Sequence, residues 1–394
     1  MTVPPDLSAR IDALADLLTA QGDLAPNSRW RTALAKVPRH LFAPAIGQAD
    51  PDRTGAERYP IDRDTDPGTW WAAVYDDASI ITQYDDGAGR VADGRGIPTS
   101  SLSAPGVVIT FLELLDVHAG HRVLDVGTGT GWTAGLLSWR VGADQVTTIE
   151  IDPGLAAQAA RNLKAAGFSP RLVIGDGLAG YAEAAPYDRV HCTCAIAAVP
   201  YAWVEQTRPG GRIVAPYQPG FGWGHKLVLD VLGDGTASGR FPSGAGYMMA
   251  RAHRRPRLPA DEWVQHGGPV EVSRTRLDPR AVAYGPPAAD LAISAHVPGV
   301  QCRAFSDPAG SGEVTVWLLD NRGPGGSWAS VDYEPGAGEY TVEQAGERRL
   351  WDETQAAYLW WLRTGRPARD RFGLTVTPTG EHFWLDTPEN VIKR

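Results

Sequence analysis

The chain has 394 residues, of which 43% are hydrophobic and 21% charged, a composition typical of a folded protein with room for two domains. Lys and Arg number 37 against 46 Asp and Glu, so the formal net charge of −9 argues against a general nucleic-acid or membrane-surface role. Three cysteines form neither a spaced metal cluster nor an even disulfide framework, which indicates no metal site and a reducing compartment.

Two helices are expected first along the chain. Apolar residues recur at helical spacing over residues 6–21 and stop at Gly22, and a second helix is expected over 28–36. Acidic and basic residues occupy the place where a secretory apolar core would lie, and no apolar window of about eighteen residues occurs. We therefore expect a cytoplasmic protein without a membrane partner.

Residues 44–98 are dominated by Asp, Gly and Pro, with two short apolar patches. This pattern predicts a long irregular excursion with one or two short strands. A loop of this length is either a functional lid or a solvated insertion, and both readings stay open.

From residue 102 onward, apolar runs alternate with helical stretches, which predicts repeated βα units. Five strands separated by four helices or helix-bearing loops favour an α/β fold with an open, mostly parallel, Rossmann-like sheet. After about residue 257 the pattern changes to strands at 313–320 and 327–334, a helix over 348–363 and a hairpin near the end. We expect three regions: 1–98 with the helices and the acidic insertion, 99–250 as the core, and 251–394 as an α+β extension.

The segment 123–131 runs from a buried strand into a glycine turn and then a helix. Glycines at 127, 129 and 131 let a ligand approach the backbone at the carboxyl end of the first strand. A dinucleotide fingerprint would need another glycine where Trp132 stands, whereas this spacing matches the loop of class I methyltransferases around S-adenosyl-L-methionine. The cofactor-binding candidates in this segment are Asp125, Gly127, Thr128, Gly129 and Gly131.

The next two strand ends each present an acid. Glu150 ends the second strand, where a carboxylate accepts hydrogen bonds from both ribose hydroxyls of a nucleoside. Asp176 ends the third and faces an adenine amino group, while Gly177 leaves room for the ring. With Ile151 these residues complete the nucleoside site, and a solvated acidic strand end is the alternative for Glu150.

An ordered series of motifs over about residues 30–230 resembles the protein L-isoaspartate O-methyltransferase family. The segments that carry the resemblance are VPRHLFAP at 37–44, TSSLSAP at 99–105, VLDVGTGTGW at 123–132, EIDP at 150–153, GDG at 175–177, APYDRVH at 185–191 and RPGGRIVAPY at 208–217. The residues alone indicate only a nucleoside-binding α/β enzyme; the substrate class comes from the resemblance.

The resemblance implies transfer of the methyl group of S-adenosyl-L-methionine to a carboxylate, with S-adenosyl-L-homocysteine as product. It makes Ser103 the residue that contacts the acceptor carboxylate, with Ser100 as a substrate-binding and Ser101 as a cofactor-binding candidate in the same loop. A helix N-cap ahead of Pro105 is the alternative role for Ser103. Cys194 is a candidate lining residue of the acceptor site, and the alternative is a buried core pair with Cys192.

The chain departs from repair enzymes in its acidic insertion and its long C-terminal region. It resembles more closely the longer actinobacterial methyltransferases of ATP-grasp maturase and other ribosomal-peptide pathways, with which it shares the RFGLTV segment at 371–376. Those enzymes methylate an Asp side chain of a modified precursor peptide, which promotes succinimide (aspartimide) formation. By this resemblance, 251–394 is a substrate-recognition region.

An acidic peptide needs a cationic surface, and the candidate substrate-binding residues are Arg251, Arg254 and Arg255 of the basic segment 251–257, unless that segment is a solvated linker. The first hypothesis is therefore an O-methyltransferase that esterifies an Asp of a precursor peptide. The alternatives are a housekeeping L-isoaspartate repair enzyme and a non-catalytic scaffold protein.

Overall fold

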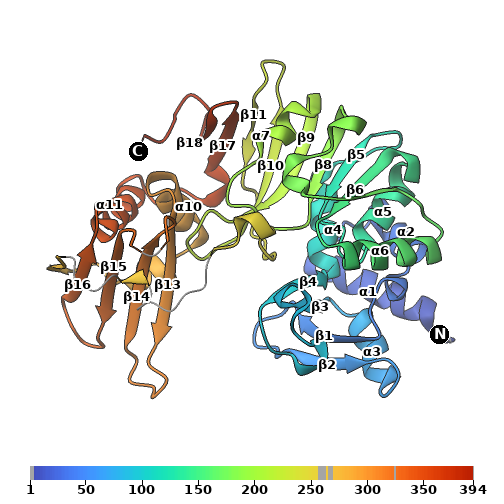
Figure 1. Ribbon diagram of the computed structural model, residues 1–394, viewed down its shortest axis with the longest axis horizontal. Helices are drawn as coiled ribbons and strands as arrows, with labels where there is room; N and C mark the ends of the chain where they lie inside the picture. The colour runs from blue at the N-terminus through green and yellow to red at the C-terminus, as the bar shows by residue number, and fades with distance from the viewer. Residues whose placement is uncertain (1–3, 256–262, 265–268, 324, 394) are drawn as a thin grey trace. The chain divides into compact units, whose positions relative to one another are not determined.

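The computed structural model describes residues 4–255, 263–264, 269–323 and 325–393 (Figure 1). The chain divides into two compact units. The first comprises Met1–Cys194, Ala202–Ala215 and Asp230–Gly235, and the second comprises Ala195–Tyr201, Pro216–Leu229 and Thr236–Arg394. Among the described residues, no helix has the length and apolar character needed to cross a membrane.

The two N-terminal helices are confirmed as α1 (Leu7–Gln21) and α2 (Arg29–Lys36). Helix α1 ends at Gly22, which adopts the left-handed conformation with φ +85° that a side chain would disfavour. The side chain of Ser28 caps α2 by accepting a hydrogen bond of 3.1 Å from the backbone N–H of Trp30.

The expectation of an irregular excursion over residues 44–98 is wrong. This region and the residues that follow it form a four-stranded antiparallel sheet in the order β2-β1-β3-β4. Its elements are β1 (Ile46–Pro51), β2 (Tyr59–Asp62), α3 (Pro67–Val74), β3 (Ala78–Tyr84) and β4 (Pro98–Leu102). The strands are short and pair across long loops, so little periodicity is visible in the local sequence.

The core of the first unit contains five parallel strands in the order β9-β8-β5-β6-β7, which confirms the predicted parallel sheet. Strand β5 pairs in parallel with both β6 and β8, so successive strands are added first on one side of β5 and then on the other. Open α/β sheets bind ligands at such a point. The elements are α4 (Pro105–Leu115), β5 (Val123–Val126), α5 (Trp132–Val141), β6 (Val146–Glu150), α6 (Pro153–Ala165), β7 (Arg171–Ile174), β8 (Tyr187–Cys192), α7 (Tyr201–Glu205) and β9 (Thr207–Tyr217).

The second unit contains the strand order β18-β17-β11-β10 and a five-stranded antiparallel sheet in the order β12-β16-β15-β14-β13 (Figure 1). The predicted strands, helix and hairpin of the extension are confirmed. The elements are β10 (His225–Val231), β11 (Ala237–Arg240), β12 (Glu271–Thr275), α9 (Arg280–Ala283), α10 (Pro287–His296), β13 (Val300–Ser306), β14 (Val314–Asp320), β15 (Trp328–Tyr333), β16 (Tyr340–Ala345), α11 (Leu350–Arg363), β17 (Phe372–Thr377) and β18 (Gly380–Leu385).

Candidate active site

The glycine loop follows β5 and adopts a left-handed backbone that favours glycine. Gly127, Gly129 and Gly131 have φ values of +90°, +55° and +91°, in the left-handed region. A β-carbon added at Gly127 would lie 2.6 Å from Oγ1 of Thr193. The N–H groups of Gly127 and Thr128 both donate to the carbonyl of Ile149, at 2.9 and 3.1 Å. The loop is therefore held against β6 with its backbone open to a ligand.

Glu150 ends β6 beside this loop and is only 6% exposed. Its Oε2 accepts a hydrogen bond of 2.8 Å from the N–H of Gly129, and its Oε1 accepts one of 3.0 Å from the N–H of Asp152. Burial raises the pKa of this carboxyl, and the backbone donors oppose that shift. Each oxygen keeps a further lone pair, which suits a pair of ribose hydroxyls. Ile151, next in the chain, presents an exposed apolar side chain.

Asp176 lies exposed just beyond the end of β7, and its Oδ1 accepts a hydrogen bond of 3.0 Å from the N–H of Leu178. A β-carbon at the buried Gly177 would lie 2.5 Å from Cγ1 of Val126, so this residue must be glycine. The glycine loop, Glu150 and Asp176 thus follow three adjacent strands in the order expected. This donor and acceptor set fits the ribose and adenine of S-adenosyl-L-methionine.

A hydrogen-bonded network lies beneath the glycine loop. Asp125 is fully buried, and its carboxylate contacts Nδ1 of His191 at 2.9 Å and accepts from Oγ1 of Thr148 at 2.8 Å. Thr148 in turn contacts the hydroxyl of Thr128 at 2.6 Å. The side chains of Asp125 and Thr128 therefore hydrogen-bond to residues of the neighbouring strands, and this network supports the glycine loop. The sequence reasoning missed Thr148 and His191, although a polar residue inside an apolar strand is the signal for such a network.

The Ser loop, residues 99–105 at the end of β4 and the start of α4, borders the glycine loop. On β4, the hydroxyl of Ser100 accepts a hydrogen bond of 3.1 Å from Thr82, and the carbonyl of Ser101 lies 3.6 Å from where a β-carbon of Gly129 would be. Ser103 is half-buried, and its hydroxyl has no hydrogen-bond partner within the described part of the chain. Ala104 is the N-cap residue of α4, without a side-chain bond, so the alternative of Ser103 as helix cap is wrong.

Two further residues, Gln83 and Thr99, connect β3 and β4 to the cofactor edge, by which we mean the strand ends that carry the glycine loop, Glu150 and Asp176. Sequence reasoning missed both. Thr99 donates a hydrogen bond of 2.9 Å to Oε1 of Gln83, whose amide nitrogen donates to Oδ2 of Asp152 at 3.2 Å. Oδ1 of Asp152 also caps α6. The strands that carry the Ser loop are thereby tied to the residue that bonds Glu150.

Cys194 lies against the glycine loop. A β-carbon at Gly127 would lie 3.8 Å from its Sγ, and the Sγ atoms of Cys192 and Cys194 are 3.4 Å apart. Both cysteines are free thiols. Burial raises the pKa of Cys192, so this thiol stays protonated and packs as a small apolar group.

The basic segment begins in the second unit, and residues 256–257 of it lie outside the described residues. The guanidinium of Arg255 donates to the backbone carbonyls of Pro219, Gly220 and Val300. Burial lowers its pKa. Nε of Arg254 donates to the carbonyl of Met249 at 3.2 Å, and Arg251 begins a short 3-10 helix. Arg255 thus stabilises backbone within its own unit, whatever else this segment binds.

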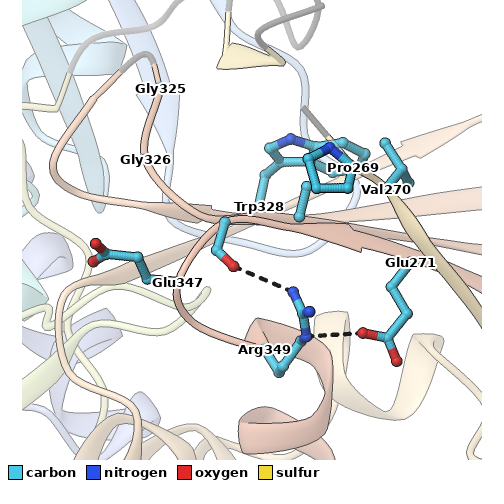
Figure 2. Close-up of a pocket in the computed structure, with 10 residues that line it drawn as sticks. Pro269, Val270, Glu271, Gly325, Gly326, Trp328, Glu347 and Arg349 are labelled. Atoms are coloured by element: carbon cyan, nitrogen blue, oxygen red, sulfur yellow. Dashed lines mark hydrogen bonds and ion pairs between the residues drawn. The ribbon is translucent and has the colours of Figure 1, made fainter. Parts of the chain in front are cut away.

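The second unit also contains a cavity of about 450 Å³ at one end of its five-stranded sheet (Figure 2). Trp328, Pro269 and Val270 supply apolar walls. Arg349 lies at its edge, paired with Glu271 at 2.9 Å and donating to the carbonyl of Gly346 at 3.2 Å. The charges at the rim are therefore paired, and the apolar wall is the part available to a ligand.

Comparisons with known proteins agree with this geometry. The family model of protein-L-isoaspartate(D-aspartate) O-methyltransferase matches residues 66–228. A protein-L-isoaspartate O-methyltransferase 2 of Archaeoglobus fulgidus is 34% identical over 220 residues, which are 55% of this chain and 83% of that protein. A protein-L-isoaspartate O-methyltransferase of Thermococcus onnurineus is 37% identical over 150 residues, 38% of this chain and 68% of that protein.

One solved structure, of a protein-L-isoaspartate O-methyltransferase, superposes with a TM-score of 0.53 at 19% identity and covers 96% of this chain and 100% of that one. At this identity the likeness confirms the fold alone. The sequence relatives establish the family and its activity. The chain belongs to the protein-L-isoaspartate O-methyltransferase family and is a protein carboxyl O-methyltransferase that uses S-adenosyl-L-methionine.

Proposed function

We propose that this enzyme esterifies the free carboxylate of an isoaspartyl residue in a peptide or protein chain. The observation that carries the proposal is the half-buried Ser103, whose hydroxyl has no partner among the described residues, in a loop that borders the glycine loop. The relatives named above support an isoaspartyl acceptor more directly than the precursor peptide that the sequence first suggested.

A carboxylate is already ionised near pH 7, so the reaction needs no general base. It needs removal of water and in-line placement of the attacking oxygen. When bound, S-adenosyl-L-methionine supplies an electrophilic methyl group. Glu150 accepts from the ribose hydroxyls, Asp176 accepts from the adenine amino group, and the glycine loop lets the ligand approach the backbone. The hydroxyl of Ser103 donates to one acceptor oxygen and leaves the other free to attack.

A second candidate is methylation of an Asp side chain in a ribosomally made peptide that a maturase has already modified. The observation that favours it is the strand-rich second unit, most of which lies beyond the end of the family match at residue 228. In this reaction the neighbouring backbone amide attacks the methyl ester and expels methanol, which closes an aspartimide. The cavity beside Trp328 is a candidate anchor for such a peptide.

Mass spectrometry with two peptides of identical sequence, one isoaspartyl and one aspartyl, tests the proposal. We expect a gain of one methyl group on the isoaspartyl peptide and none on the aspartyl peptide. Labelling of neither peptide, with conversion of a maturase-treated precursor by net loss of one water, contradicts the proposal and supports the second candidate.

A matched pair of variants tests the cavity. Val270 lines it and is 45% exposed, whereas Val272 is 63% exposed and is not among the lining residues. If the cavity anchors a precursor peptide, Val270→Asp raises the KM for that peptide and Val272→Asp does not. Equal KM values for the two variants contradict the anchor.

A further inference from the structure

The backbone of the Ser loop is held by a buried arginine that comes from a distant part of the chain. Arg39 is 1% exposed and lies in a short 3-10 helix at Arg39–Leu41. Its Nη2 donates to the carbonyls of Leu102 and Ser103 at 3.3 and 3.0 Å. Arg39 therefore fixes the two peptide groups that flank the α-carbon of Ser103, just before α4 begins.

The same guanidinium connects this loop to its surroundings. Nη1 donates to the carbonyl of Val74 at 2.7 Å, and Nη2 also donates to that of Ala78 at 2.6 Å. The guanidinium carbon lies 5.4 Å from the centre of the Trp132 ring, in the helix that follows the glycine loop. Burial lowers the pKa of Arg39 to about 10, against the opposing effect of Asp77, so the side chain keeps its charge at neutral pH.

Asp77 holds the other end of the loop. It is 5% exposed, and its Oδ1 accepts a hydrogen bond of 2.8 Å from the N–H of Gly106 in the first turn of α4. A β-carbon at Gly106 would lie 2.6 Å from Asp23 and 2.8 Å from Asp77, so the carboxylates pack directly on this backbone. Asp77 thus caps α4 from a separate segment, where the N-cap residue Ala104 has no side-chain bond.

We propose that Arg39 and Asp77 are positioning residues of this methyltransferase, a clamp that fixes the backbone of Ser103–Gly106 so that the Ser103 hydroxyl stands at the acceptor carboxylate. The inference rests on the proposed role of Ser103. Within the described part of the chain, neither Arg39 nor Asp77 forms a hydrogen bond with Glu150, so the clamp acts on acceptor placement and leaves cofactor affinity unchanged.

Hydrogen exchange measured by mass spectrometry tests the clamp without any substrate. Asp77→Ala removes the acceptor of the Gly106 N–H, whereas Asp77→Asn keeps a side-chain oxygen at the same place. We expect faster exchange over residues 102–108 in the alanine variant and near-wild-type exchange in the asparagine variant. Asp16→Ala, which removes an exposed ion pair with Arg31, is the control and leaves this segment unchanged. Wild-type exchange in Asp77→Ala overturns the clamp.

Kinetics with the isoaspartyl peptide then show whether the clamp acts through Ser103. We expect Asp77→Ala to lower kcat/KM about tenfold or more, because a displacement near 1 Å has effects of this order. The affinity for S-adenosyl-L-homocysteine should stay within about twofold of wild type, and Asp77→Asn should restore most of the activity. A parallel loss of cofactor affinity overturns the positioning role.

A double variant completes the test. Asp77→Ala should lower turnover little further in a Ser103→Ala background, since the group that the clamp positions is already gone. Losses that multiply overturn the inference. Arg39→Lys, which keeps the charge but loses the fork of donors, should behave as Asp77→Ala does. If the wild-type enzyme methylates no isoaspartyl peptide, the proposed function is contradicted. The clamp on the backbone is still tested in that case, because the hydrogen-exchange measurement needs no activity.

Discussion

Replacing Glu150 by Gln tests the assignment of the cofactor edge most sharply. Both oxygens of this carboxylate accept from backbone N–H groups, at 2.8 Å from Gly129 and 3.0 Å from Asp152. An amide keeps one oxygen, so its NH2 group must face one of these donors, and one backbone N–H loses its acceptor. The ribose hydroxyls also lose a charged acceptor. The change is close to isosteric, so its effect reports hydrogen bonding and charge more than packing.

The expected magnitude follows from the charge and the burial. A hydrogen bond to a charged group contributes about 1.5–3 kcal/mol, and this carboxylate is too buried for solvent to screen it. We therefore expect the dissociation constant of S-adenosyl-L-homocysteine to rise about 10- to 150-fold in Glu150→Gln.

Isothermal titration calorimetry measures this change, with Asp144→Asn as the matched control. Asp144 is an exposed carboxylate that precedes the same strand and lies outside the glycine loop, so its variant should bind as wild type does. Circular dichroism and the melting temperature show whether each variant is folded. A change of less than twofold in a folded Glu150→Gln protein would refute the assignment of Glu150 to the ribose.

Three other outcomes are expected. Thr148→Val leaves the buried carboxylate of Asp125 with one hydrogen bond fewer, so urea unfolding should show a loss of about 1–3 kcal/mol in the free energy of unfolding; an unchanged midpoint contradicts the network. Ser103→Ala should keep the affinity for S-adenosyl-L-homocysteine within about twofold and lower turnover at least about tenfold, and full turnover would exclude an acceptor role. Burial raises the pKa of Glu150, so its ionised, binding form is lost at a higher pH than that of an ordinary glutamate; as the pH is lowered, cofactor affinity should fall in wild type but stay flat in Glu150→Gln.

The parallel core was predictable because its signals are local. Buried strands such as β5 read as apolar runs, the glycine loop follows directly in the chain, and each acid stands at or just after the end of its strand. Candidate residues for the nucleoside site could therefore be proposed from the glycine spacing and from the order of the strand ends.

The sheet β1–β4 could not be predicted in the same way. Its four strands have between four and seven residues, and its pairings bridge loops whose lengths no local pattern reveals. The contacts of Arg39, Asp77 and His191 were hidden for the same reason, since their partners lie far away in the chain. The contacts of Arg255 were equally hidden, because its charge gives no sign that the guanidinium holds backbone carbonyls distant in the chain.

The residues assigned to the cofactor edge and to the Ser loop all belong to the first unit, which the chain completes with two short later segments. Chemistry and much of the additional length are thus encoded in different stretches of sequence. On the proposal that the strand-rich extension recognises the substrate, mutations there change substrate preference over evolutionary time without disturbing the glycine loop, Glu150 or Ser103. For protein engineering, this separation makes the extension the natural target of a randomised library, while the transfer machinery is left as it is.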